Sequence, residues 1–158
     1  MATTLSTATL TVTIKETITL NGSAQGSLNT KSLSGIATIS KRIIDVTTTE
    51  AVIATFSAAV AAGNYIAADV MYLRFTNLDD TNFVTLTFRN QDNDEFAVKV
   101  DAGHSFILSG DNVNGMSAVF NATQDADAAS STNFGSLTNI QADADTDSCD
   151  LEVLIASV

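Results

Sequence analysis

Four aspartates near the C-terminal end of the sequence have the residue type and spacing that could bind a metal ion. They stand at Asp143, Asp145, Asp147 and Asp150. Calcium prefers several hard oxygen ligands, and carboxylates two residues apart can converge when the chain curls, although this stretch lacks the glycine and glutamate of an EF-hand loop. In an extended chain the same carboxylates lie along one face and do not surround an ion. We favour a solvated acidic edge that discourages aggregation, with calcium binding as the alternative and no other cofactor expected.

The remaining reactive side chains do not form a catalytic pattern. His104 is the only histidine and precedes Ser105, but adjacent residues of a strand point to opposite faces and cannot act as base and nucleophile. Cys149 is the only cysteine and lies among acidic residues, whose field disfavours the thiolate. The chain has no Trp and two Tyr, so the aromatic platforms of sugar-cleaving sites are missing. We therefore expect no enzyme activity.

Two further acidic stretches, Asp79-Asp80 and residues 92–95, fall in predicted turns. Asn and Asp are common in turns because their side chains bond the local backbone and tolerate left-handed φ angles. We favour this structural role, and a cation shared between the two turns is the alternative.

Composition and charge narrow the class of protein. The chain has 158 residues, 45% of them apolar, and a net charge of −11, which indicates one folded domain over residues 1–158. All seven basic residues lie between Lys15 and Lys99, so residues 101–158 alone carry nine acidic groups and no basic one. So acidic a chain is a poor partner for nucleic acid. No apolar run is long enough to span a membrane, and the first residues lack a signal-peptide pattern.

The elements that must position these side chains are predicted to be strands. Over residues 9–20, apolar positions that include Leu10, Val12 and Ile14 alternate with Thr-rich positions. Alternation with period two indicates a strand buried on one face. The segment is long for a strand, so we expect it to cross between sheets or to bend near Glu16.

Later strands are expected at a spacing of about ten residues, separated by turns rich in Asn, Asp and Gly. After a turn at 21–27, the expected strands are 34–46, 70–75, 83–89, 96–100, 105–108, 116–120 and 151–155. This pattern is typical of an all-β fold, an antiparallel β-sandwich or jelly roll of about eight or nine short strands.

Two segments give mixed signals. Residues 47–62 combine a capping-box pattern and an Ala-rich run, which favour a helix, with an alternation of apolar residues that favours a strand. We predict a strand at about 50–57 and a loop through Gly63-Asn64. Residues 121–148 form a polar segment in the sequence, with a mobile stretch expected at 122–132, and no strand is assigned there.

The middle of the chain carries a resemblance to a known class of proteins. The segments concerned are Tyr72-Leu-Arg-Phe-Thr-Asn-Leu-Asp79, Asn82-Phe-Val-Thr-Leu86, Phe96-Ala-Val-Lys-Val100 and Ala102-Gly-His-Ser-Phe-Ile107. Over about residues 70–108 the chain resembles small β-sandwich structural proteins of tailed bacteriophages, particularly marine phages. In those proteins a strand ends in an Asn-x-Asp turn, and a Gly-Ser-Phe pattern enters a later strand. The resemblance implies a virion component.

The expected function is therefore that of a non-enzymatic capsid decoration (cement) protein, made in the host cytoplasm and located in the virion. It is expected to form a symmetric homo-oligomer, a trimer being one candidate, and to contact other virion proteins such as the major capsid protein. Residues 1–20 are available as a strand or arm exchanged with a neighbouring subunit. The alternatives are a tail, fibre or adaptor subunit that binds a host surface, and a non-viral self-assembling filament subunit. Neither nucleic acid nor a membrane is expected as a partner.

Overall fold

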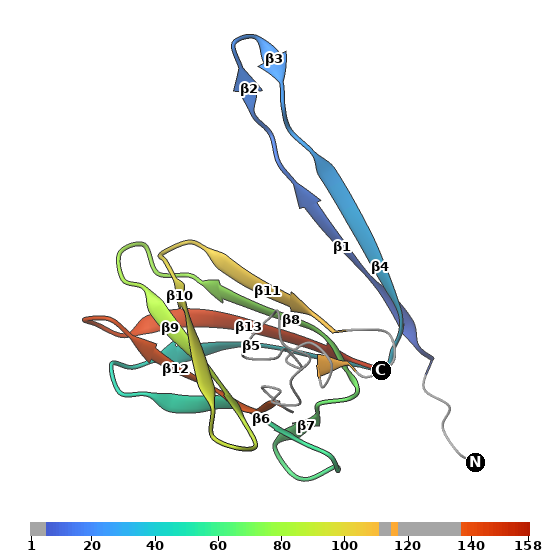
Figure 1. The fold of residues 1–158 in the computed structure, drawn as a ribbon, viewed down its shortest axis with the longest axis vertical. Coiled ribbons are helices and arrows are strands. Elements are labelled where there is room, and N and C mark those ends of the chain that lie inside the picture. Colours follow the sequence, from blue (N-terminus) through green and yellow to red (C-terminus); the bar gives the residue numbers. More distant parts are fainter. Residues whose placement is uncertain (1–5, 111–114, 117–136) are drawn as a thin grey trace, which may run out of the picture. The chain divides into compact units, whose positions relative to one another are not determined.

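The computed structural model of the chain describes residues 6–110, 115–116 and 137–158. These residues form thirteen β-strands, nearly all paired antiparallel, which confirms the predicted all-β fold (Figure 1). The first four strands are β1 (Ala8–Lys15), β2 (Thr19–Leu20), β3 (Ser23–Ala24) and β4 (Leu28–Ile36). The next five are β5 (Thr38–Val46), β6 (Ala51–Ser57), β7 (Asn64–Ile66), β8 (Val70–Asn77) and β9 (Val84–Asn90). The last four are β10 (Glu95–Val100), β11 (Ser105–Ser109), β12 (Leu137–Ala144) and β13 (Cys149–Ser157).

The strands divide between two compact units within the predicted single domain. Residues 1–38 form one unit together with Val158, and residues 39–157 form the other. We call β1 to β4 the arm and β5 to β13 the sandwich. The sandwich holds one five-stranded and one four-stranded sheet, which agrees with the eight or nine strands expected, and the arm adds two small two-stranded sheets.

The arm is a β-hairpin. Strand β1 pairs with β4 antiparallel, with Val12 opposite Lys31. Farther along, β2 pairs with β3 across a two-residue turn at Asn21 and Gly22, whose φ angles are 51° and 81°. An Asn-Gly pair with positive φ at both positions is the favoured sequence of a tight hairpin turn. The strand predicted over residues 9–20 is thus interrupted between Lys15 and Thr19, next to the bend expected at Glu16.

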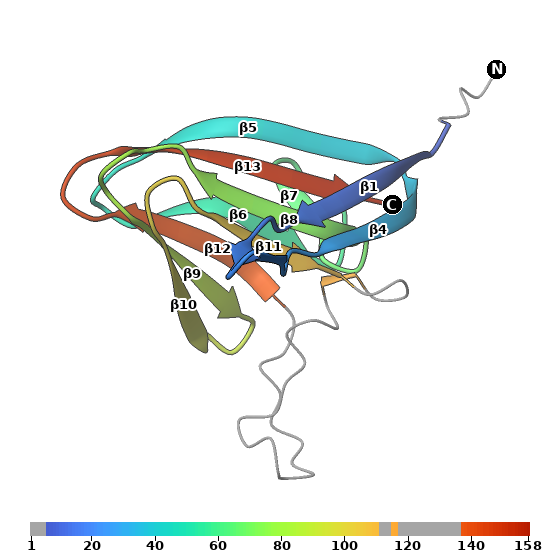
Figure 2. The same ribbon diagram turned by 90° about the horizontal axis from the view of Figure 1, so that it is seen from above.

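The sandwich consists of two layers, which Figure 2 shows from above. The strand order is β10-β9-β12-β6-β7 in one sheet and β11-β8-β13-β5 in the other. The two late strands β12 and β13 therefore lie inside their sheets, each between two strands from earlier in the chain.

Side chains from both sheets form one hydrophobic core. At its centre Phe75 of β8 meets Phe88 of β9 edge to face, with ring centroids 6.3 Å apart. The Phe88 ring also stacks on Phe96 at 4.7 Å and contacts the edge of Phe106 at 5.8 Å. Because Phe75 and Phe106 belong to one sheet and Phe88 and Phe96 to the other, the aromatic cluster joins the two layers.

Most of the predicted strands are present, with two corrections. The strand at 50–57 is confirmed as β6, whereas the stretch 34–46 belongs to two strands, β4 and β5, which separate at Ala37. The polar segment 121–148 contains β12, so the prediction of no strand there was wrong for residues 137–144. Of the strand expected at 116–120, only Met116 lies within the described residues, and the stretch 122–132 lies outside them.

Candidate functional site

The four aspartates of the predicted calcium site are spread over two strands and the loop between them. Asp143 is half-buried on β12, whereas Asp145, Asp147 and Asp150 are exposed. Burial raises the pKa of the Asp143 carboxyl, and the nearby Glu50 raises it further. Within the described ranges, no three His, Cys, Asp or Glu side chains converge as metal ligands. Calcium binding by these residues stays a prediction.

The structure gathers Asp150 with a different set of acidic side chains. Asp150, Asp45, Asp79 and Asp80 line a shallow cavity of about 340 Å³. The Asp79 carboxylate is already engaged, because it accepts the backbone N–H groups of Thr81 and Asn82 at 2.8 and 2.6 Å. The bond from Asn82 is the main cause that lowers the pKa of Asp79, followed by that from Thr81. This grouping links residues far apart in the sequence, and spacing alone gave no signal for it.

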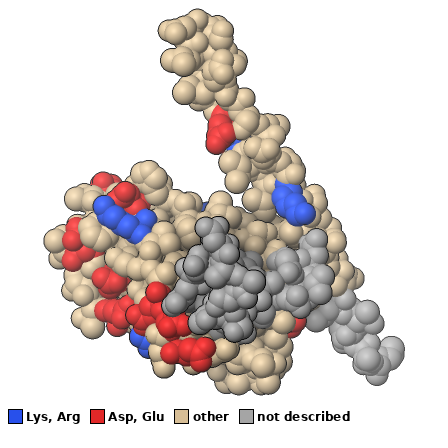
Figure 3. Space-filling model, in the orientation of Figure 1, with Lys and Arg blue, Asp and Glu red and all other residues tan. Residues whose placement is uncertain are grey.

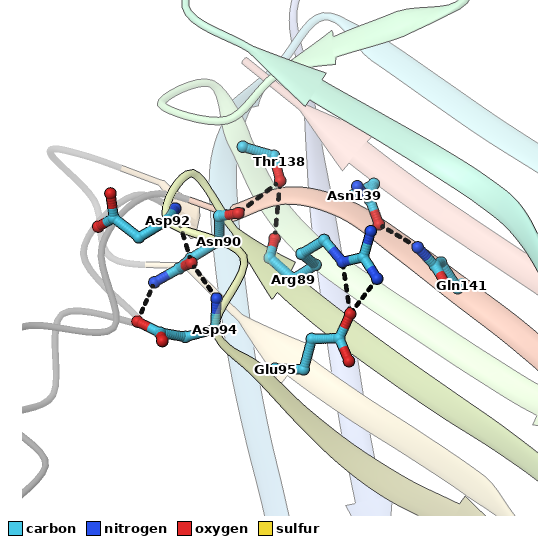
Figure 4. A network of polar contacts seen from close by, with 8 residues as sticks. All are labelled: Arg89, Asn90, Asp92, Asp94, Glu95, Thr138, Asn139 and Gln141. Carbon is cyan, nitrogen blue, oxygen red and sulfur yellow. Dashed lines mark hydrogen bonds and ion pairs between the residues drawn. The ribbon is translucent and has the colours of Figure 1, made fainter.

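The acidic turns are built around two buried asparagines that end β8 and β9. Asn77 accepts the backbone N–H of Asp79 at 3.0 Å. Asn90 accepts the N–H groups of Asp92 and Asp94 at 2.9 and 2.8 Å (Figure 4). These contacts confirm the interpretation that Asn and Asp are present in these turns to bond the local backbone.

Polar contacts also hold β12 against β9 beside the second turn. The Thr138 hydroxyl lies 3.0 Å from the carbonyl oxygens of both Arg89 and Asn90. The Arg89 guanidinium pairs with Glu95 on the neighbouring strand β10 (Figure 4). The network ties three adjacent strands together, which gives it a structural role.

The remaining reactive side chains make separate contacts. The ring Nδ1 of His104 lies 2.9 Å from the Ala102 carbonyl, whereas the Ser105 hydroxyl contacts that of Thr76 at 2.8 Å. The Cys149 side chain is 1% exposed. Burial, followed by the charge of Asp79, raises the pKa of the Cys149 thiol. His104 and Ser105 therefore do not face each other, as expected.

The outer face of the four-stranded sheet carries a second charged network. The Glu152 carboxylate on β13 contacts Lys41 Nζ at 2.9 Å and pairs with Arg74 of β8. The bond from Lys41 is the main cause that lowers the pKa of Glu152, and Arg74 adds to it. This network connects the edge strand β5 to the two strands at the centre of the sheet.

The arm presents the largest set of exposed apolar side chains close together in sequence. They are Ile14, Ile18, Leu20 and Leu28, with exposed fractions of 48, 54, 60 and 65%. The prediction that the apolar side of residues 9–20 is buried was therefore wrong for Ile14, Ile18 and Leu20 within a single chain. In the face drawn in Figure 3, acidic side chains gather over the sandwich, whereas the arm carries few charges. The arm is the candidate interaction site of the molecule.

Comparison of the chain with protein-family models, curated proteins and solved structures finds no match. In the part of the chain that the structure describes, no helix is long and apolar enough to cross a membrane.

Proposed function

We propose that the chain is a non-enzymatic structural subunit that assembles with copies of itself, as a capsid decoration (cement) protein of a tailed bacteriophage. The arm carries the proposal. It is a two-stranded ribbon in a compact unit of its own, and four of its apolar side chains, Ile14, Ile18, Leu20 and Leu28, are about half exposed or more, whereas Leu33 and Ile36 are buried. An isolated two-stranded hairpin is marginally stable in water. A protein surface that covers these side chains would stabilise the ribbon. In a homo-oligomer, a neighbouring copy of the chain provides that surface.

The apolar side chains at the base of the arm share one face. Leu10 lies opposite Leu33, and Val12 lies opposite Lys31, so these residues and Ile14 point to the same side of the ribbon. Thr11 and the residues of the same parity point to the other side. One face is therefore the more apolar, with Leu33 already buried and Ile14 exposed, and the other is mostly hydroxyl-bearing apart from Leu28 opposite Lys15.

The resemblance over residues 70–108 supports the phage particle as the location and the major capsid protein as a further partner. In the structure this region comprises β8 to β11 and the two Asn-x-Asp turns; β8 pairs with β11 in one sheet, and β9 pairs with β10 in the other. The proposal assigns these four strands a scaffolding role and assigns contact with other subunits to the arm.

Sedimentation velocity of the full chain over a range of concentrations tests self-assembly. An Ile14→Asp variant places a charge on the apolar face of the arm, and Thr13→Asp places the same charge on the opposite face as the matched control. We expect the full chain and Thr13→Asp to associate and Ile14→Asp to remain monomeric. A full chain that stays monomeric at every concentration refutes self-assembly, and equal association of both variants refutes the role of the apolar face.

Quantitative mass spectrometry of purified particles from a phage that encodes the chain tests the location. A copy number comparable with that of the major capsid protein is expected for a decoration protein. A few copies per particle would instead identify a tail, fibre or adaptor subunit. Complete absence from the particle, together with self-association, would favour the filament alternative.

A further inference from the structure

Strand β5 is the longest open sheet edge of the sandwich. In the four-stranded sheet it pairs with β13 on one side, and no described strand pairs with its other side. The edge strands β7, β10 and β11 are shorter, with three, six and five residues against nine in β5. An open edge of this length offers a row of backbone donors and acceptors to another strand.

The edge of β6 is also partly open and lies beside β5. Strand β7 pairs with β6 only from Thr55 to Ser57, which leaves the start of β6 without a described partner on that side. The Arg42 guanidinium of β5 donates to the carbonyl oxygen of Ile53 in β6, so the two edges meet there. A groove of about 260 Å³ lies between them. Its lining includes Ile44, Val46, Val52 and Ile53.

Three large apolar side chains of β5 and β6 are exposed, and Arg42 and Asp45 are the charged residues that line the groove. Ile39, Ile43 and Val52 are 57, 60 and 55% exposed. Proteins commonly guard open edges with free lysines or with proline. Here Lys41 pairs with Glu152 and Arg42 bonds β6, and the chain contains no Pro. The edge is therefore available for pairing.

We propose that β5, with the groove beside it, is the receptor for the arm of a second copy of this chain. Strand β1 of the second copy adds to the free edge of β5, and its Leu10, Val12 and Ile14 face covers the groove. The eight residues of β1 match the nine of β5 in length. Main-chain hydrogen bonds supply affinity in such strand addition, and alternate side chains supply specificity. The inference rests on the proposed self-assembly and names the surface that it uses.

Charge favours the arm over a second β5 as the occupant. Residues 39–157 contain five basic and seventeen acidic groups, a net charge of −12, whereas residues 1–38 contain two lysines and one glutamate, a net charge of +1. Direct pairing of two β5 edges would bring two strongly negative bodies within about one Debye length, roughly 8 Å at physiological salt. Docking of the arm avoids this repulsion and brings Lys15 and Lys31 to an acidic body.

Crosslinking between two differently tagged chains tests the pairing. One full-length chain carries Thr13→Cys, on the arm face that points away from the groove, and the other carries Ile43→Cys, on the outer face of β5. They are mixed and treated with a short bifunctional maleimide, and the native Cys149 is protected because it is 1% exposed. The matched control replaces Ile43→Cys by Ala97→Cys, an exposed position on β10, the edge strand of the other sheet. We expect a product linked through both tags with Ile43→Cys and little with Ala97→Cys.

The outcomes separate this inference from the proposed function. If the chain associates in sedimentation but the arm crosslinks equally to both edges, or to neither, the β5 receptor is wrong and self-assembly stands. If the chain is monomeric throughout, both fail together.

A charge placed in the receptor gives a second, independent measurement. We expect Val52→Asp, in the lining of the groove, to weaken self-association about tenfold or more, equivalent to about 1.4 kcal/mol or more. Val60→Asp is the control, because Val60 is a loop residue that is 85% exposed. Equal dissociation constants for the two variants would overturn the assignment of the surface.

Discussion

Asn77, the last residue of β8, holds the following turn through a single amide. Its side chain is completely buried. The amide nitrogen donates to the carbonyl oxygens of Asn82 and Val100 at 2.8 and 3.2 Å, and the amide oxygen accepts the N–H of Asp79 at 3.0 Å. An Asn77→Ala substitution leaves these three backbone groups without that partner. At about 1 kcal/mol for each hydrogen bond, the free energy of unfolding is expected to fall by about 3 kcal/mol.

Urea unfolding followed by far-ultraviolet circular dichroism measures this loss. With an m-value of about 2 kcal/mol per M, the unfolding midpoint should fall by about 1.5 M. Asn139→Ala is the matched control, because Asn139 is partly exposed and its side chain contacts Gln141 at 3.2 Å. A loss below about 1 kcal/mol for Asn77→Ala would show that water replaces the amide, and would refute the reasoning.

An Asn77→Asp variant tests the same site through pH. It keeps the shape of the side chain, but its carboxylate would face two carbonyl oxygens. Folding then favours the protonated acid and raises the pKa of the introduced carboxyl above the value of about 3.9 in an unfolded chain. The unfolded state therefore releases the proton first, and the variant loses up to about 1.4 kcal/mol per pH unit as the pH rises above about 4. A stability deficit that does not change between pH 4 and 7 would contradict this account.

Three further predictions concern single side chains of the sandwich. Glu152→Gln removes the ion pairs with Lys41 and Arg74, which lower the pKa of Glu152. The free energy of unfolding, measured with urea at each pH, should therefore fall by about 1 kcal/mol at pH 7. This difference from the unsubstituted chain should disappear as the pH falls below about 4. Burial raises the pKa of the Cys149 thiol, so Cys149 should react with a chromogenic disulfide reagent only after unfolding. Fast labelling of the native chain would contradict this prediction. Phe88→Ala should cost about 3–5 kcal/mol in calorimetry and Phe88→Leu less, because leucine refills part of the cavity; a Phe88→Leu loss equal to that of Phe88→Ala would contradict this role of volume filling.

The strands from β8 to β11 were predictable because local signals agree there. Except for Arg74, the stretch from Val70 to Phe75 is apolar on both faces, as in a strand buried on two sides, and β8 is mostly buried. The Asn-rich turns that follow are specified by side chains that bond their own backbone, so they depend little on distant residues.

Strand β12 was missed because the second half of its buried face is made of alanines. Ile140, Ala142 and Ala144 alternate with polar side chains and are 2% exposed or less. The alternation is present in the sequence, but alanine carries a weak apolar signal, and Asp143 and Asp145 made the stretch look like an acidic loop. The assignment of β12 to the centre of a sheet depends on pairing with β6 and β9, which lie far away in the sequence.

The acidic cavity and the exposure of the arm could not be predicted from the sequence, for a different reason. Asp45, Asp79 and Asp150 come together only after strands from three parts of the chain are assembled. The alternation in residues 9–20 correctly indicated a strand, but a periodic pattern does not say which molecule covers its apolar side. A second copy is the partner proposed for it.

The positions of β12 and β13 have a consequence for the order of events in folding. Strands β12 and β13 are the last described strands that the ribosome makes. Each lies in its sheet between two strands that are made earlier. Neither layer can therefore close during most of synthesis, whereas the hairpin of the arm has only local pairings and can form at once. The chain should fold slowly and as a whole after its C-terminal strands emerge, and the apolar arm is then exposed to other nascent copies before a finished receptor edge exists.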